Sequence, residues 1–219
     1  MGTSVKICGL KDKEAIDAAI AGGASHVGFI FFEKSPRNVS NAAAAALAAY
    51  AKGRANRVAV TVNADDETLD AIVADVGPDT LQLHGSESPE RVANVKRRYG
   101  MPVIKAIALR EQGDLDKIEP YRAIADRFLF EAKPPTGSDR PGGNGIAFDW
   151  RILSRLEDDT DYMLSGGLDA RNIGAALAET NAKAVDLSSG VERAPGIKDV
   201  RLITEFFDAL RLAEESARV

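Results

Sequence analysis

The feature that most constrains the fold of this 219-residue chain is a series of eight short apolar segments rich in β-branched and aromatic residues. Successive segments start between about 21 and 34 residues apart, and each precedes a polar loop and a helix-like stretch, which is the spacing of strand–helix units rather than hairpins. Their nearly continuous apolar character is typical of parallel strands covered on both faces. The segments are Val5–Gly9, Val27–Phe31, Val58–Val62, Leu81–His84, Val103–Ile107, Phe128–Ala132, Tyr162–Ser165 and Ala184–Ser188.

The residues between these segments agree with strand–helix units. Ser40 and Ser88-Pro89 are expected to begin helices, as N-caps and a first-turn proline. Glycines are expected to end four helices, at Gly22-Gly23, Gly53, Gly77-Pro78 and Gly100. Because no linker or change of composition divides the chain, we expect one α/β domain spanning residues 1–219. The predicted fold is a TIM (β/α)8 barrel, a closed parallel sheet with outer helices, and a doubly wound open sheet is the alternative.

Composition excludes several classes of function. The single cysteine rules out an internal disulfide and a thiolate metal site, which fits a reducing compartment, so we expect a cytoplasmic protein without a metal. A net charge of −5 without a basic stripe argues against a nucleic-acid partner. The longest apolar run, residues 42–51, is too short to span a bilayer, so no membrane partner is expected.

In a barrel of this kind the site lies at the C-terminal ends of the strands. Two glycine turns follow the last two predicted strands, Ser165-Gly166-Gly167 and Ser188-Ser189-Gly190. Barrels commonly hold a phosphate at these two positions, so Gly166, Gly167, Ser189 and Gly190 are candidate phosphate ligands. The alternative is a pair of tight turns, since glycine is the ordinary turn residue.

Two ionisable residues at strand ends are candidates for proton transfer. Strand alternation places Lys6 and Cys8 on one face, where the ammonium would favour the thiolate; the alternative is a buried, inert cysteine. Glu131 ends an otherwise apolar strand, and a partly desolvated carboxyl there would suit a general acid. The alternative for Glu131 is a structural ion pair with Lys6, Lys105 or Lys133.

Three further residues are candidate substrate ligands. Asp186 could bind sugar hydroxyls or neutralise an interior lysine. His84 ends the fourth strand, where a hydrogen-bonded structural role is the commoner one. Arg37, on the long loop after the second strand, could hold a carboxylate bidentately, although a solvated loop arginine is commoner.

The order and spacing of several motifs resemble the phosphoribosylanthranilate isomerase family, from Val5 to about Asp199. These motifs are Lys6-Ile7-Cys8-Gly9, Gly28-Phe29-Ile30-Phe31, Ser35-Pro36-Arg37, Leu81-Gln82-Leu83-His84-Gly85, Gly142-Gly143-Asn144-Gly145, Phe148-Asp149-Trp150, Leu164-Ser165-Gly166-Gly167-Leu168, the stretch 185–192 and Pro195-Gly196.

The resemblance implies a cofactor-free Amadori rearrangement in tryptophan biosynthesis, with a small phosphorylated aminosugar, N-(5-phosphoribosyl)anthranilate, as substrate. Cys8 matches the family's general base and Arg37 the residue that holds the anthranilate carboxylate. Asp186 matches a residue near the ribose hydroxyls, and the two glycine turns match the phosphate site. A monomer or a homodimer is expected, because a closed barrel has no sheet edge that requires a partner.

One catalytic position departs from the family pattern. The family's acid is an aspartate, and the matching residue here is Glu131, one methylene longer. A misplacement of about an ångström can cost on the order of a hundredfold in rate. An impaired or non-catalytic ligand-binding barrel is therefore the alternative function. A sister phosphate-binding lyase is a weaker one, supported only by Lys6 and Lys105. The segment from Lys133 to Gly145 is expected to move over the substrate.

Overall fold

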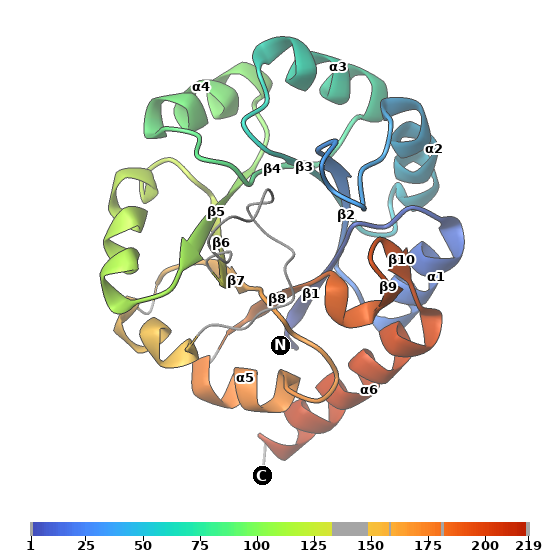
Figure 1. The fold of residues 1–219 in the computed structure, drawn as a ribbon, viewed down its shortest axis with the longest axis vertical. Coiled ribbons are helices and arrows are strands. Elements are labelled where there is room, and N and C mark those ends of the chain that lie inside the picture. Colours follow the sequence, from blue (N-terminus) through green and yellow to red (C-terminus); the bar gives the residue numbers. More distant parts are fainter. Residues whose placement is uncertain (1, 133–148, 158, 181, 218–219) are drawn as a thin grey trace.

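The computed structural model describes residues 2–132, 149–157, 159–180 and 182–217. Eight parallel strands pair in sequence order, and the last pairs with the first, so the sheet closes into a barrel that the helices surround (Figure 1). The strands are β1 (Ser4–Cys8), β2 (His26–Phe31), β3 (Asn56–Thr61), β4 (Thr80–Leu83), β5 (Val103–Leu109), β6 (Arg127–Ala132), β7 (Tyr162–Leu164) and β8 (Ala184–Leu187).

The predicted closed barrel is confirmed, and the open doubly wound sheet is wrong. Every observed strand begins and ends within two residues of its predicted segment. The agreement follows from the apolar runs themselves, since each strand is buried both against the lumen and against the helices.

The helices lie outside the strands, and most of the predicted helix ends are confirmed. Ser40 and Ser88 accept hydrogen bonds from backbone N–H groups in the first turns of their helices. Gly23, Gly77 and Gly100 take left-handed C-cap conformations. The helices are α1 (Lys13–Gly22), α2 (Asn41–Ala51), α3 (Asp66–Val76), α4 (Pro89–Tyr99), α5 (Ile173–Thr180) and α6 (Val200–Ser216).

The second helix ends at its predicted glycine, but the C-cap residue itself is the one before Gly53. Lys52 is the C-cap of α2, with φ −57°, and Gly53 follows it with φ +75°. The glycine therefore serves the turn after the helix, where a positive φ is needed.

The segments after β5 and β6 differ from the expected α-helices. They form 3-10 helices, η1 (Gln112–Tyr121) and η2 (Trp150–Arg155). Gly113 and Pro120 both weaken an α-helix in the first of these. A short helix η3 (Ser189–Val191) and a hairpin of β9 (Glu192–Ala194) and β10 (Ile197–Lys198) follow β8, and the sequence did not predict them.

Two apolar clusters form the core. One lies between the sheet and the helices, and the other fills the lumen with inward-facing residues of alternate strand positions. The lumen cluster comprises Cys8, Val58, Val60, Ile104, Ala106, Leu129, Met163 and Ala184. Because Lys6, Glu131 and Asp186 share the parity of these residues along their strands, they also point inward.

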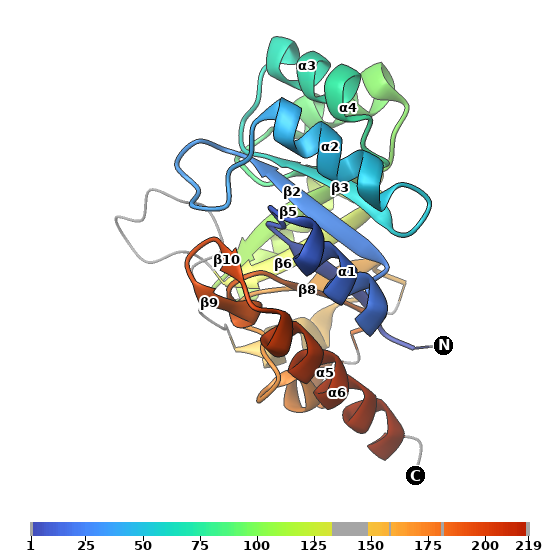
Figure 2. The same cartoon turned by 90° about the vertical axis from the view of Figure 1, so that its right-hand side faces the viewer.

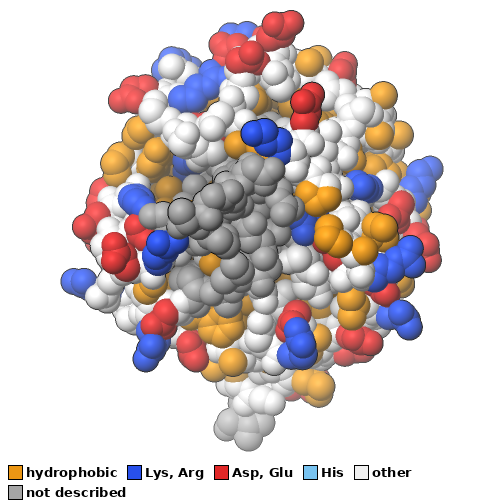
Figure 3. All heavy atoms as spheres, viewed as in Figure 1, with side chains coloured by type: hydrophobic (Ala, Val, Ile, Leu, Met, Phe, Trp, Pro, Cys, Tyr) orange, Lys and Arg blue, Asp and Glu red, His pale blue; other side chains and the backbone are white. Residues whose placement is uncertain are grey.

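The two ends of the barrel differ (Figure 2). The β9–β10 hairpin lies at one end and the chain termini lie at the other. On the face in Figure 3, basic and acidic side chains are interspersed around the rim. No helix within the described part of the chain is long and apolar enough to cross a membrane. The segment from Lys133 to Gly145 that was predicted to move, which includes the motif Gly142-Gly143-Asn144-Gly145, lies outside the described residues, as does Phe148 of the next motif.

Candidate active site

The first half of the site is a buried ion pair beneath the end of β1. The β1–β8 register places Lys6 opposite Asp186, and Lys6 Nζ donates to Asp186 Oδ1 at 2.7 Å. Lys6 is fully buried, and Ser165 Oγ donates to the other oxygen of Asp186 at 3.2 Å. Of the two roles considered for Asp186, the structure shows the neutralisation of an interior lysine; contact with sugar hydroxyls stays a prediction.

Cys8 also points into the lumen, two residues after Lys6 and therefore nearer the C-terminal end of the barrel. It is only 4% exposed. Its Sγ packs over Gly28, where a Cβ would lie 3.0 Å from Sγ and 3.2 Å from the Cys8 Cα. A glycine at this register position of β2 therefore makes room for the thiol.

The electrostatics of Cys8 correct one expectation. Burial raises the pKa of the Cys8 thiol, and this outweighs Lys6 and Lys198, which lower it. Asp186 adds to the rise because it offsets the charge of Lys6. Lys6 is close enough to favour the thiolate, as predicted, but the resting group is a thiol whose pKa lies above its usual value.

The second half of the site joins β4 to β6. Glu131, 6% exposed, lies at the end of β6, and its Oε1 is 2.6 Å from His84 Nε2. The other ring nitrogen of His84, Nδ1, is 2.7 Å from Gln82 Nε2. Burial lowers the pKa of His84, but the Glu131 carboxylate outweighs burial and raises it above the usual value. Of the described residues, histidine and not lysine is therefore the partner of Glu131.

His84 and Glu131 meet across β5, which lies between their strands. The inward-facing β5 residues at this level are Ala106 and Ala108, and Ala108 is paired in register with Glu131. Because an alanine side chain ends at Cβ, the imidazole and the carboxyl can approach over the strand. The structure places His84 on the candidate acid, and a direct contact with substrate stays a prediction.

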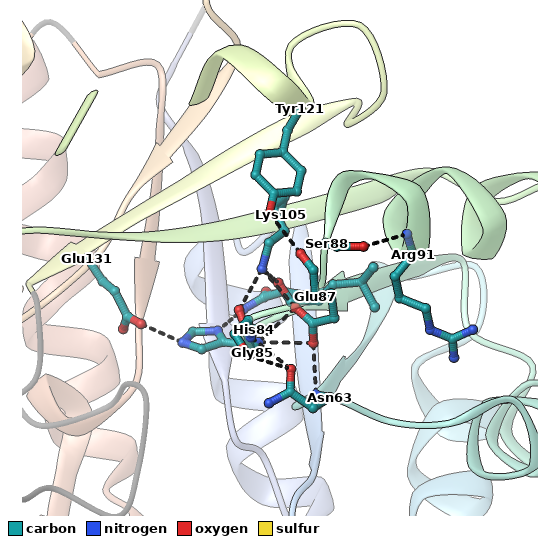
Figure 4. A network of polar contacts seen from close by, with 12 residues as sticks. Asn63, His84, Gly85, Glu87, Ser88, Arg91, Lys105, Tyr121 and Glu131 are labelled. Carbon is teal, nitrogen blue, oxygen red and sulfur yellow. Dashed lines mark hydrogen bonds and ion pairs between the residues drawn. The ribbon is translucent and has the colours of Figure 1, made fainter. Parts of the chain in front are cut away.

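A buried network outside the barrel holds the turn that carries His84 (Figure 4). Lys105 points away from the lumen, and its Nζ donates to Gly85 O at 2.7 Å and Glu87 Oε2 at 2.8 Å. Glu87 Oε1 accepts from the N–H groups of Asn63 and Gly85. Since Lys105 is committed to this network, it gives no support to a lyase with a catalytic lysine in the lumen.

Arg37 is buried rather than solvated, because the β9–β10 hairpin covers it. It is 4% exposed, and its Nε and Nη2 donate to the two carboxylate oxygens of Glu192 at 2.7 and 2.8 Å. Lys198 Nζ also donates to Glu192 and to Ser188 O. No role for Glu192 or Lys198 was predicted from the sequence. Glu192 ends the family-like stretch 185–192, whereas no sequence pattern predicted the β9–β10 hairpin that positions Lys198.

The two glycine turns lie against each other. Gly166 and Gly167 have φ of +94° and +64°, which favour glycine. A Cβ on Gly190 would lie 1.9 Å from Leu168 O, so the turn after β8 packs directly on the turn after β7. Ser188 Oγ donates to Cys8 O and thereby ties this rim to the end of β1.

Comparison with known proteins identifies the family. The family model for N-(5'-phosphoribosyl)anthranilate (PRA) isomerase matches residues 5–209. The N-(5'-phosphoribosyl)anthranilate isomerase of Rhizobium meliloti (strain 1021) is 63% identical over 98% of this chain and 100% of its own length. The enzyme of that name from Brucella canis is 63% identical over 96% of this chain and 95% of its own length.

Solved structures agree with this result. Phosphoribosyl anthranilate isomerase from Thermotoga maritima has a TM-score of 0.85 and 32% identity, covering 95% of this chain and 98% of its own. A phosphoribosyl anthranilate isomerase in complex with reduced 1-(o-carboxyphenylamino)-1-deoxyribulose 5-phosphate has a TM-score of 0.82 and 30% identity, with the same coverage of both chains. The chain therefore belongs to the phosphoribosylanthranilate isomerase family.

Proposed function

We propose that this barrel converts N-(5-phospho-β-D-ribosyl)anthranilate to 1-(2-carboxyphenylamino)-1-deoxy-D-ribulose 5-phosphate, with Cys8 as general base and Glu131 as general acid. The observation that carries the assignment of roles is that both residues lie at the C-terminal ends of strands of one closed barrel, with their side chains pointing into the lumen. They are the thiol of β1 and the carboxyl of β6. The reaction is an aldose–ketose isomerisation in tryptophan biosynthesis.

The reaction needs one proton donated and one removed. The Glu131 carboxyl protonates the furanose ring oxygen, the C1–O bond breaks, and the ring opens to a Schiff base. The Cys8 thiolate then removes the proton from C2 to give an enolamine. On ketonisation C1 gains a proton and the C2 hydroxyl loses one, so both catalytic groups return to their starting states.

The remaining site residues hold the substrate. The turns of Gly166-Gly167 and Ser189-Gly190 bind the phosphate through backbone N–H groups in this proposal, which the packing of one turn on the other supports. Arg37, kept rigid by Glu192, binds the carboxylate of the anthranilate ring in this proposal, and Asp186, which neutralises Lys6, also contacts the ribose hydroxyls. We further infer a cytoplasmic, cofactor-free enzyme, one domain over residues 1–219, either monomer or homodimer. A Thermotoga maritima relative is described as dimeric.

The test is turnover of freshly generated phosphoribosylanthranilate, followed by the loss of anthranilate fluorescence. We expect turnover by the protein as it stands, and a loss of at least about a hundredfold in kcat for Cys8→Ala and for Glu131→Gln. Absence of turnover at high enzyme concentration would overturn the proposal.

The comparisons give no support to the alternative of an impaired, non-catalytic barrel, and Glu131→Asp tests it directly. A sharp rise in kcat for this variant would show that the longer glutamate is a defect. Unchanged or lower kcat shows that Glu131 is a competent acid in its own contact with His84.

A further inference from the structure

Three polar side chains contact one another in series within the described lumen, and the one farthest from the catalytic acid has no role in the reaction proposed above. Gln82 is fully buried, and it contacts His84, which in turn contacts Glu131 (Figure 4 shows the second contact). Gln82 Oε1 is one of the buried side-chain atoms without a hydrogen-bond partner in the described part of the protein. A native protein rarely leaves a buried carbonyl unpaired, so this orphan oxygen needs an explanation.

We propose that His84 is the proton store for Glu131, and that Gln82 is a positioning residue that turns its amide to match the protonation of His84 Nδ1. The proposal rests on the function proposed above, and it adds two residues to the acid half of the site.

The geometry gives Gln82 two useful orientations. In the structure, the amide N–H donates to Nδ1, which requires a neutral imidazole with its proton on Nε2 toward Glu131. When His84 carries both protons, Nδ1–H would face a second donor. A half-turn of the terminal amide then presents Oε1 to Nδ1–H, and this turn breaks no other bond of Oε1 because it has none in the described structure. The orphan oxygen is therefore the acceptor for the cationic state.

The proton transfers balance. Glu131, as a carboxylate, takes the proton of His84 Nε2–H and passes it to the ring oxygen, so the imidazolium becomes neutral and keeps its remaining proton on Nδ1, against Gln82 Oε1. The proton that the C2 hydroxyl loses on ketonisation restores the pair. The groups that face His84 are Glu131 from β6, Lys6 from β1 and Asp186 from β8. Lys6 and Asp186 are paired with each other, so Glu131 dominates the charge around the imidazole.

The chain offers a clean experiment, because it has only two histidines. NMR of 15N-histidine-labelled protein follows both imidazoles through a pH titration. His26, whose pKa burial lowers to about 4, stays neutral near pH 7 and serves as the internal reference. Two substitutions of similar length at position 82 give opposite predictions. Gln82→Met has no acceptor for Nδ1–H and lowers the titration midpoint of His84 by about one pH unit, while Gln82→Glu, an acceptor only, raises it.

The matched control is Gln112→Met on the exposed side of η1, which leaves the His84 midpoint in place. A packing role for Gln82 would change stability without moving the midpoint in opposite directions. The proposal is overturned if the midpoint stays fixed in both position-82 variants, or if both variants move it the same way. Should Gln82→Met fail to fold, a midpoint in Gln82→Glu at or below that of the unchanged protein is itself sufficient to overturn it.

The titration needs no substrate, so it separates this inference from the proposed function. The expected midpoints with no turnover would remove the isomerase mechanism and leave the His84–Gln82 pairing intact. Turnover with unmoved midpoints would leave the isomerase mechanism intact and remove the His84–Gln82 pairing. With both intact, the acidic limb of the kcat/KM pH profile moves with the NMR midpoint in each variant.

Discussion

Replacing Asp186 with asparagine leaves the fully buried Lys6 without its anion. At the observed 2.7 Å and an effective dielectric of about 20, the attraction between the two charges is about 6 kcal/mol. The buried pair has already lost its hydration, so removal of one partner typically costs about 3–5 kcal/mol of unfolding free energy. For a chain of this size that loss lowers Tm by roughly 6–20 °C.

The pH dependence of the Asp186→Asn variant gives a second signature. With Asp186 in place, the pKa of Lys6 is raised above its usual value despite burial, so the pair's stabilisation is complete below pH 10.5 and is lost above it. In the variant the largest opposing charge is gone, so burial lowers the pKa of Lys6, although Cys8 still acts to raise it. Between this lowered pKa and 10.5 the unfolded chain binds more protons, so the variant becomes more stable as pH rises.

Thermal unfolding followed by circular dichroism across pH measures both effects. The matched control is Asp17→Asn, which removes an exposed partner of Arg54 and should leave Tm unchanged within error. The double variant Lys6→Met with Asp186→Leu should recover much of the loss, because it leaves no buried charge. A Tm within about 2 °C of the parent for Asp186→Asn, or a double variant no better than the single, would refute the reasoning.

Two other substitutions test the supports of each half of the site. Gly28→Ala places a Cβ 3.0 Å from Cys8 Sγ, so the thiol must shift by a few tenths of an ångström; kcat in the fluorescence assay should fall about tenfold while Tm changes little. Unchanged kcat would show that the thiol position is not critical. Glu87→Gln leaves Lys105 buried without an anion and should lower Tm by about 6–20 °C, whereas Glu90→Gln, on the exposed first turn of α4, should not. Equal effects of the two changes would remove the special role assigned to the Lys105 network.

The barrel could be predicted because its signals are local. Each strand is an apolar run, and alternation along it decides which side chains face the lumen, so Cys8 and Glu131 could be placed from sequence. The 3-10 helix after β5 was less predictable, since Gly113 and Pro120 both weaken a regular α-helix there.

Partner choice could not be predicted, because it depends on register between strands. The candidate partners of Glu131 were Lys6, Lys105 and Lys133, yet its partner among the described residues is His84, 47 residues away and two strands over. Likewise, Lys6 could have paired with Glu131 or Asp186, and the β1–β8 register decides for Asp186. The register between strands therefore decides whether a buried carboxyl pairs with a lysine, as Asp186 does, or with a histidine, as Glu131 does.

The two halves of the site together determine how the rate responds to pH. Catalysis needs Cys8 ionised and the His84–Glu131 pair protonated. Burial raises the pKa of Cys8 above its usual value of 9.0, and Glu131, against burial, raises that of His84 above 6.5. If the pKa of the thiol is the higher one, the form with Cys8 ionised and the pair protonated is a minor species. Its fraction is constant at pH values between the two pKa values.

The kcat/KM profile should then rise up to the His84 midpoint, stay level, and fall beyond the Cys8 midpoint. Each tenfold loss of proton affinity at His84 lowers the plateau value of kcat/KM tenfold. The contact with Gln82 therefore affects the rate directly. The rate of Cys8 alkylation against pH locates the thiol independently. An alkylation midpoint that coincides with the acidic limb would mean that Cys8, and not the His84–Glu131 pair, limits the enzyme at low pH, and this assignment would be wrong.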